Sequence, residues 1–166
     1  MKSIFAGIDR AVEIFVAAIF TSMVLIGFWQ VFSRFVLNVT PSWSEEVQIW
    51  GHIWLVFLAI PIAYRRGAHI TVEAIRRIMT SWMNRAFDWM IEALWIGFAV
   101  ATAYYSYRVS LVTGNSVSPG LELPMSYPYY GMIIGSVYLL FVIIRRLLGE
   151  LPPPDPGELP PEVTTP

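Results

Sequence analysis

The chain has 166 residues, of which 56% are hydrophobic and only 14% are charged, and its mean hydropathy is +0.58. Soluble domains carry about 25% charged residues, so this composition indicates a membrane protein rather than a water-soluble one. The net charge of -1 argues against a nucleic-acid partner, and the absence of cysteine rules out disulfides, thiolate metal sites and a cysteine nucleophile.

Four stretches without charged residues predict membrane-spanning helices, at residues 14–33, 47–64, 93–107 and 123–144. A spanning helix needs about 20 mostly apolar residues, which the first, second and fourth stretches provide. The third is long enough only if its helix starts near Phe87 and includes Glu92, or both Asp88 and Glu92. Such carboxylates must lie near the headgroups or face protein. The first apolar run is longer than that of a signal peptide, so we expect a retained helix.

The basic residues predict the orientation of the spans. Nine of the eleven lie before the first span, between the second and third, or after the fourth, whereas Arg34 and Arg108 lie on the other side. Short loops rich in lysine and arginine stay in the cytoplasm. Both termini and the central loop are therefore expected to be cytoplasmic.

Two further regions lie outside the spans. Residues 70–84 place their apolar side chains on one helical face and arginines elsewhere, which favours an amphipathic helix in the headgroup plane over a connecting helix packed on the bundle. Residues 151–166 hold seven of the twelve prolines and predict a disordered cytoplasmic tail. We therefore expect an all-α integral membrane protein: a transmembrane domain at residues 1–150, with four transmembrane helices and an amphipathic interfacial helix between the second and third.

The second span carries the main polar candidates. Glu45, Gln48 and His52 are spaced by three and four residues, so they form one stripe, and His52 lies inside the span. An ionisable residue inside a membrane suggests a proton or ion relay. The alternative is a polar seam that packs helices through hydrogen bonds. We favour the seam, because no acid lies at mid-depth in the first or fourth span.

The flanks of the second span also carry candidates. Residues 42–45, Ser-Trp-Ser-Glu, match a capping box at the start of a helix. We expect Glu45 and Glu46 to cap this helix and also to contact a basic group of a partner. At the other end, Arg65, Arg66 and His69 are expected to bind lipid phosphate or acidic groups of a partner, or to act only as positive-inside anchors.

Enzymatic and cofactor motifs are absent from the sequence. Haem ligation in a membrane bundle needs paired histidines, and of the two histidines only His52 lies in a span. The same count excludes a zinc site. There is no phosphate-binding glycine loop, no serine-hydrolase elbow and no HExxH motif. We therefore expect no enzymatic activity, no cofactor and no metal.

Several motifs resemble a known family. The second span and its flanks read Trp43-Ser44-Glu45-Glu46, then Trp54-Leu55-Val56-Phe57-Leu58-Ala59, then Tyr64-Arg65-Arg66-Gly67-Ala68-His69-Ile70-Thr71-Val72. This order resembles the small membrane subunit, of the DctQ type, of tripartite ATP-independent periplasmic (TRAP) transporters. The outer loop, Gly114-Asn115-Ser116 and Leu121-Glu122-Leu123-Pro124-Met125-Ser126-Tyr127-Pro128, is also similar. The resemblance covers roughly residues 5–148.

The resemblance implies a subunit of a secondary transporter in the bacterial inner membrane. In this family a periplasmic binding protein delivers an organic acid or similar solute, and a large permease subunit of about twelve spans carries the substrate and ion sites. An ion gradient, usually of sodium, drives uptake. The small subunit packs against the large one as part of its fixed scaffold. The chain shows no internal repeat of the kind from which many transporters build their own site.

The implied partners are the large permease, the binding protein and membrane lipids. Contact with a partner or lipid is expected at Trp43, Glu45, Glu46, Gln48, His52, Arg65, Arg66 and His69. Two other functions stay open. One is a four-helix membrane anchor of an electron-transfer or quinone-linked complex that uses His52, and the other is a membrane enzyme of unknown type.

Overall fold

The computed structural model describes residues 2–39, 41–66 and 80–149, and these residues form four helices. They are α1 (Lys2–Phe35), α2 (Ser42–Arg65), α4 (Ser81–Thr113) and α5 (Tyr127–Leu147). Each is long and apolar enough to cross a bilayer. The expected all-α membrane protein with four spanning helices is therefore confirmed.

The predicted interfacial helix differs from the structure at its end. Trp82 and Met83, which were expected on that helix, lie in the first turn of α4 instead. This start gives α4 33 residues and places Glu92 well inside it. The rest of the predicted interfacial helix, His69 and the tail at residues 151–166 lie outside the described residues, so those predictions stay predictions.

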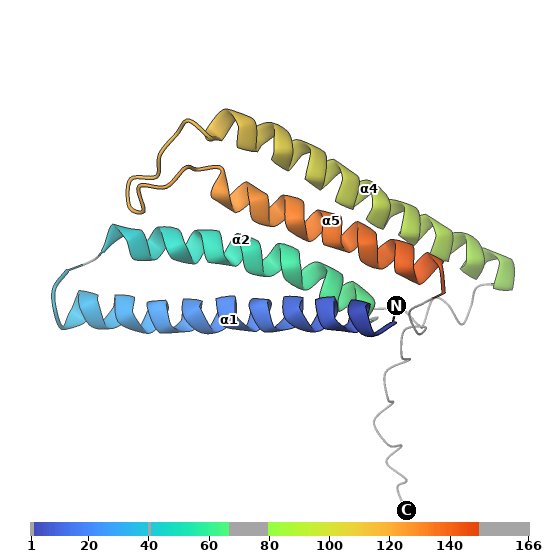
Figure 1. Ribbon diagram of the computed structural model, residues 1–166, viewed down its shortest axis with the longest axis horizontal. Coiled ribbons are helices and arrows are strands. Elements are labelled where there is room, and N and C mark those ends of the chain that lie inside the picture. The colour runs from blue at the N-terminus through green and yellow to red at the C-terminus, as the bar shows by residue number, and fades with distance from the viewer. Residues whose placement is uncertain (1, 40, 67–79, 150–166) are drawn as a thin grey trace, which may run out of the picture.

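The helices form an open row, an arrangement that the sequence analysis left undetermined (Figure 1). Extensive contacts join α1 to α2, α2 to α5 and α5 to α4, so the order across the row is α1, α2, α5, α4. Helix α5 is thus enclosed by neighbours on two sides. It supplies four members of the buried core, Tyr138, Leu139, Val142 and Ile143.

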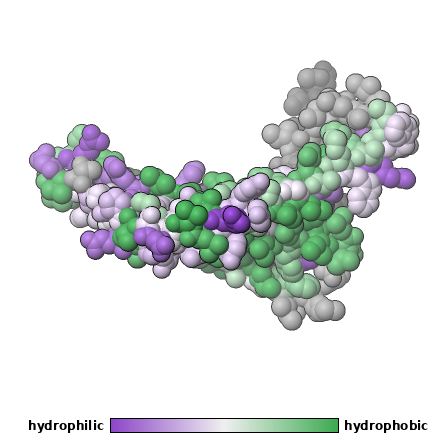
Figure 2. All heavy atoms as spheres, turned by 90° about the horizontal axis from the view of Figure 1, so that it is seen from above, coloured by the Kyte–Doolittle hydropathy of each residue, from purple (hydrophilic) through white to green (hydrophobic). Residues whose placement is uncertain are grey.

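The two ends of the row differ in which helix termini and loops they contain. At one end, here called the terminal end, α1 and α4 begin and α2 and α5 finish (Figure 1, right). At the other, the loop end, residues 36–41 join α1 to α2 and residues 114–126 join α4 to α5 (Figure 1, left). Figure 2 shows hydrophilic side chains near both ends, a further hydrophilic group near the middle of the view, and a broad hydrophobic surface to the right of that group.

Two glycines allow α5 to lie directly against α2. A Cβ atom on Gly131 would lie 2.7 Å from the Trp54 ring, and one on Gly135 would lie 2.4 Å from the carbonyl oxygen of Phe57. Pro61, which lies four residues after Phe57, has no N–H to donate to that carbonyl. Residues 131–135 therefore form the small-x-x-x-small pattern that lets membrane helices approach closely.

The opposite side of α5 packs against small residues of α4. Ala99, Ser106 and Ser110 are 0–5% exposed and follow each other at spacings of seven and four residues, which places them on one face of α4. Since α5 is the only helix with which α4 makes extensive contacts in the described residues, this face lies against α5. Small residues thus line both sides of the central helix.

Large apolar side chains cover the remaining surface. Leu25 and Phe28 on α1, and Leu94 and Tyr105 on α4, are each more than 60% exposed. Exposed apolar area of this extent indicates contact with lipid or with another protein. A row one helix thick has two such faces. Most of the chain's apolar surface is therefore available to contact lipid or another protein.

Candidate functional site

Charged groups from three helices meet at Asp9 near the terminal end. Arg65 Nη1 of α2 lies 2.6 Å from Asp9 Oδ2, and Arg145 Nη1 of α5 lies 3.1 Å from the same oxygen. The Tyr138 hydroxyl donates a hydrogen bond of 2.7 Å to Asp9 Oδ1. Asp9 is only 4% exposed. These four residues, here called the Asp9 cluster, tie α1 to α2 and α5.

More charges extend this cluster. Glu13, one helical turn after Asp9, accepts hydrogen bonds from Arg65 and, at 2.9 Å, from Arg66. The Arg145 guanidinium also lies 4.7 Å above the centre of the Phe5 ring, a favourable cation–π distance. Arg65 is therefore held by two carboxylates of its own chain, whereas the side chain of Arg66 is 64% exposed.

A second set of polar contacts, close to the Asp9 cluster, joins α4 to α2 and α5. The Tyr64 hydroxyl of α2 donates to Glu92 of α4, and Arg146 Nε of α5 lies 3.6 Å from Glu92. The Arg146 guanidinium also lies 5.0 Å above the Tyr64 ring. Glu92 thus faces protein, which is one of the two placements that its position in a span allows.

The sequence prediction anticipated only part of this arrangement. It singled out Arg65 and Arg66 but not their carboxylate partners, nor Tyr64, Tyr138 and Arg145. Asp9 and Glu13 are four residues apart, and the predicted topology puts them on the same side of the membrane as Arg65. The acidic face of the first helix and the basic end of the second could therefore have been predicted to form ion pairs. The contacts that Tyr138, Arg145 and Arg146 of α5 make with other helices depend on a register that no local pattern specifies.

The predicted capping box at the start of α2 is wrong. Pro41 occupies the N-cap position in an extended conformation, and no side chain caps the helix. The Ser44 hydroxyl instead donates a hydrogen bond of 2.7 Å back to the Pro41 carbonyl. Because helix α2 begins at Ser42, that serine lies inside its first turn and is not at the cap position that the motif requires.

Glu46 binds the connection between α4 and α5. Its carboxylate accepts hydrogen bonds from the Ser118 hydroxyl and from the backbone N–H groups of Gly120 at 3.0 Å and Leu121 at 2.9 Å. A Cβ atom on Gly120 would lie 2.9 Å from this carboxylate, so a larger residue there would displace the Glu46 side chain. Glu46 therefore holds residues 118–121 against the start of α2. Its predicted contact with a partner stays a prediction.

The predicted stripe of Glu45, Gln48 and His52 divides between two surroundings. Gln48 donates a 3.3 Å hydrogen bond to Gln30 of α1, so it lies between helices. Glu45 and His52 are exposed. Together with Ile49 and Val56, they form a row on the outer face of α2, here called the outward stripe. Trp43, 38% exposed, lies just before it.

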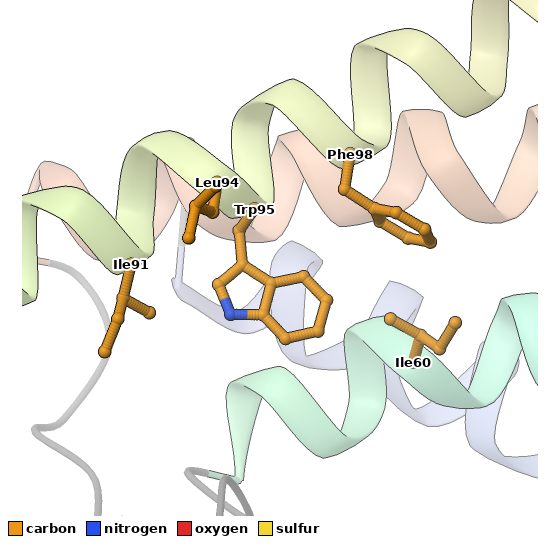
Figure 3. A pocket seen from close by; sticks show the side chains of 5 residues that line it. All are labelled: Ile60, Ile91, Leu94, Trp95 and Phe98. Atoms are coloured by element: carbon orange, nitrogen blue, oxygen red, sulfur yellow. The ribbon is translucent and has the colours of Figure 1, made fainter.

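Two cavities between the described helices are lined mainly by apolar side chains. One, of about 390 Å³, lies between Ile60 of α2 and Ile91, Leu94, Trp95 and Phe98 of α4 (Figure 3). A second, of about 420 Å³, lies between α1, α2 and the α4–α5 loop, and Ser22 carries the one hydroxyl among its lining residues. Neither offers cationic groups to an anion. In the described part of the chain, no three histidine or carboxylate residues converge as metal ligands.

Comparisons with known proteins agree on one family. The family model "Tripartite ATP-independent periplasmic transporters, DctQ component" matches residues 23–152. The chain is 26% identical to the putative TRAP transporter small permease protein of Haemophilus influenzae, over 91% of this chain and 94% of the relative. It is 23% identical to the C4-dicarboxylate TRAP transporter small permease protein DctQ of Rhodobacter capsulatus, over 92% and 83%.

A further relative is much longer. The isethionate TRAP transporter permease protein DctMQ of Oleidesulfovibrio alaskensis is 25% identical over 113 residues, which make up 66% of this chain and 18% of that protein.

The Glu46 contacts lead to a prediction about the loop end. Replacing Glu46 with Ala removes the acceptor of two backbone N–H groups, so the amides of Gly120 and Leu121 should exchange hydrogen for deuterium faster than in the wild type. Glu45→Ala is the matched control, because Glu45 is exposed and adjacent in sequence. Hydrogen–deuterium exchange in detergent, followed by mass spectrometry, measures the exchange of these amides in both variants. Equal exchange of residues 118–121 in the two variants would contradict the assignment.

Proposed function

The chain belongs to the DctQ family of tripartite ATP-independent periplasmic transporters, and from this premise we propose that it packs against the large permease subunit of such a transporter. The name DctMQ of the longer relative combines the letter Q of the DctQ component with a second letter, M, and the match covers only 18% of that protein. We infer that the remainder of that relative is the large permease, so that in it both parts share one polypeptide. This supports direct packing of the two components.

The observation that carries the proposal is the open row of helices with its exposed apolar faces. Such a row leaves most of its spanning surface to be covered, and a large membrane subunit is a suitable cover. The two cavities described above also do not suit an anionic solute. A buried organic anion would need several cationic or amide donors near mid-depth, and both cavities are lined by apolar side chains.

We therefore assign the transport chemistry to other components. In this proposal the large twelve-span permease holds the solute and ion sites, and a periplasmic binding protein delivers an organic acid or a similar solute. An ion gradient drives uptake. The chain itself contributes fixed scaffold and carries out no enzymatic reaction. The family assignment argues against the alternative of an electron-transfer anchor.

We further propose that the chain resides in the bacterial inner membrane with the terminal end in the cytoplasm. The basis is the positive-inside distribution, because Arg65, Arg66, Arg145 and Arg146 all lie at this end. The contacts that α1 makes through Asp9 and Glu13 support its retention as a structural helix.

The orientation can be tested because the chain contains no cysteine. Ser116 at the loop end and Arg85 near the start of α4 are both exposed, so either can be replaced with Cys. In intact cells an impermeant thiol reagent should label Ser116→Cys and leave Arg85→Cys unlabelled, whereas lysed cells should allow both reactions. Labelling of Arg85→Cys alone in intact cells would reverse the proposed orientation.

The function is tested by purification and reconstitution. A tagged copy of the chain should co-purify with the large permease subunit of its transporter when the two are co-expressed. In liposomes with an imposed sodium gradient, the two subunits and the binding protein together should take up solute, whereas the chain alone should take up none. Uptake by the chain alone, or failure to co-purify with the permease, would contradict the proposal.

A further inference from the structure

The outward stripe of α2 contains a polar group that its own chain leaves exposed. Helix α2 packs extensively against α1 and α5, and near the terminal end it also meets α4 through Ile60 and Tyr64. Glu45, Ile49, His52 and Val56 follow each other at spacings of four, three and four on its exposed face. Ile49 is 60% exposed and Val56 is 37% exposed. Within the described ranges no hydrogen bond or ion pair engages the His52 imidazole.

The position of His52 makes this exposure costly in lipid. It lies ten residues after the first residue of α2 and thirteen before the last. At 1.5 Å per residue these intervals are about 15 and 20 Å, so His52 lies close to the middle of a hydrocarbon core about 30 Å thick. A polar side chain at that depth, without a hydrogen-bond partner, is strongly disfavoured.

A histidine side chain does not reach the headgroups from this depth. Long lysine and arginine side chains extend to the interface from positions near helix ends, but imidazole is short. Contrast Thr21 on α1, which is also exposed within a span. Its hydroxyl donates a 2.9 Å hydrogen bond to the Ala17 carbonyl one turn earlier and so needs nothing from outside. His52 has no such partner within the described helices.

We propose that the outward stripe is the contact surface for a transmembrane helix of the large permease, and that this helix places a hydrogen-bonding side chain opposite His52. The inference rests on the proposed function and adds to it a face, a depth and a chemistry. Ile49 and Val56 supply apolar packing above and below the imidazole. Glu45 lies at the loop end of the stripe, where a cationic or hydroxyl group of the partner meets it.

A second copy of the chain is a poorer occupant of this surface. A two-fold axis along the membrane normal places equivalent residues opposite each other. Glu45 would then face Glu45, and like charges in contact are destabilising. The helix of a different protein avoids this repulsion and can carry a complementary group at each position.

The test measures affinity for the permease in lipid nanodiscs. His52→Leu should weaken the complex by about threefold to fifteenfold, the effect of losing one hydrogen bond between membrane helices. It should leave the thermal midpoint of the isolated chain unchanged or raised, because an exposed polar group is removed. His52→Gln retains hydrogen bonding and should bind close to the wild-type level. Thr21→Val is the matched control and should have no effect on binding.

Photo-reactive residues at Ile49 and Val56 locate the surface independently of the substitutions. Both should cross-link to the permease. Wild-type affinity in His52→Leu, with cross-links only to lipid or to a second copy of the chain, would overturn this inference and leave the proposed function intact. Failure of the wild-type chain to bind the permease at all would overturn both.

Discussion

A buried carboxylate at Asp9 is the constraint on which the arrangement of the helices depends. Two arginines from α2 and α5 and a tyrosine hydroxyl from α5 converge on it. Breaking a buried ion pair by removing one partner leaves an uncompensated charge, which is far more costly than losing an exposed pair. Asp9 therefore fixes the register of α1 against two other helices at once.

This constraint explains how a row of helices one layer thick keeps its shape. In lipid, apolar contacts between helices gain little from the hydrophobic effect, because lipid tails are equally apolar. Close packing through Gly131, Gly135 and the small residues of α4 supplies part of the cohesion. Polar groups at the two ends supply specificity. The Asp9 cluster does so at the terminal end, and the bonds of Glu46 to the α4–α5 loop do so at the loop end. In the proposed function such a row is part of the fixed scaffold, and both of its faces stay available to lipid or a partner.

The sequence predicted the number and nature of the helices because the gaps between charged residues match the thickness of a bilayer. It did not predict the open row, since side chains that face lipid and side chains that face protein are equally apolar. The capping box failed because a local motif does not determine at which residue a helix begins. Asp9 and Arg145 are 136 positions apart, and Glu46 and Gly120 are 74 apart. Contacts between residues so far apart in the sequence follow from the packing of whole helices, which no local pattern specifies. For the same reason the sequence identified His52 as a polar residue inside a span, but only the structure shows that its side chain is exposed.

The most direct test of this account is the stability of Asp9→Asn in detergent, measured by reversible denaturant unfolding. Asparagine keeps the shape of the side chain but leaves Arg65 and Arg145 without their shared carboxylate. We expect a loss of about 3–5 kcal/mol in the free energy of unfolding. Arg66→Gln removes the exposed member of the same network and should cost less than about 1 kcal/mol. If Asp9→Asn is no less stable than Arg66→Gln, the Asp9 cluster does not hold the helices together and the account is wrong.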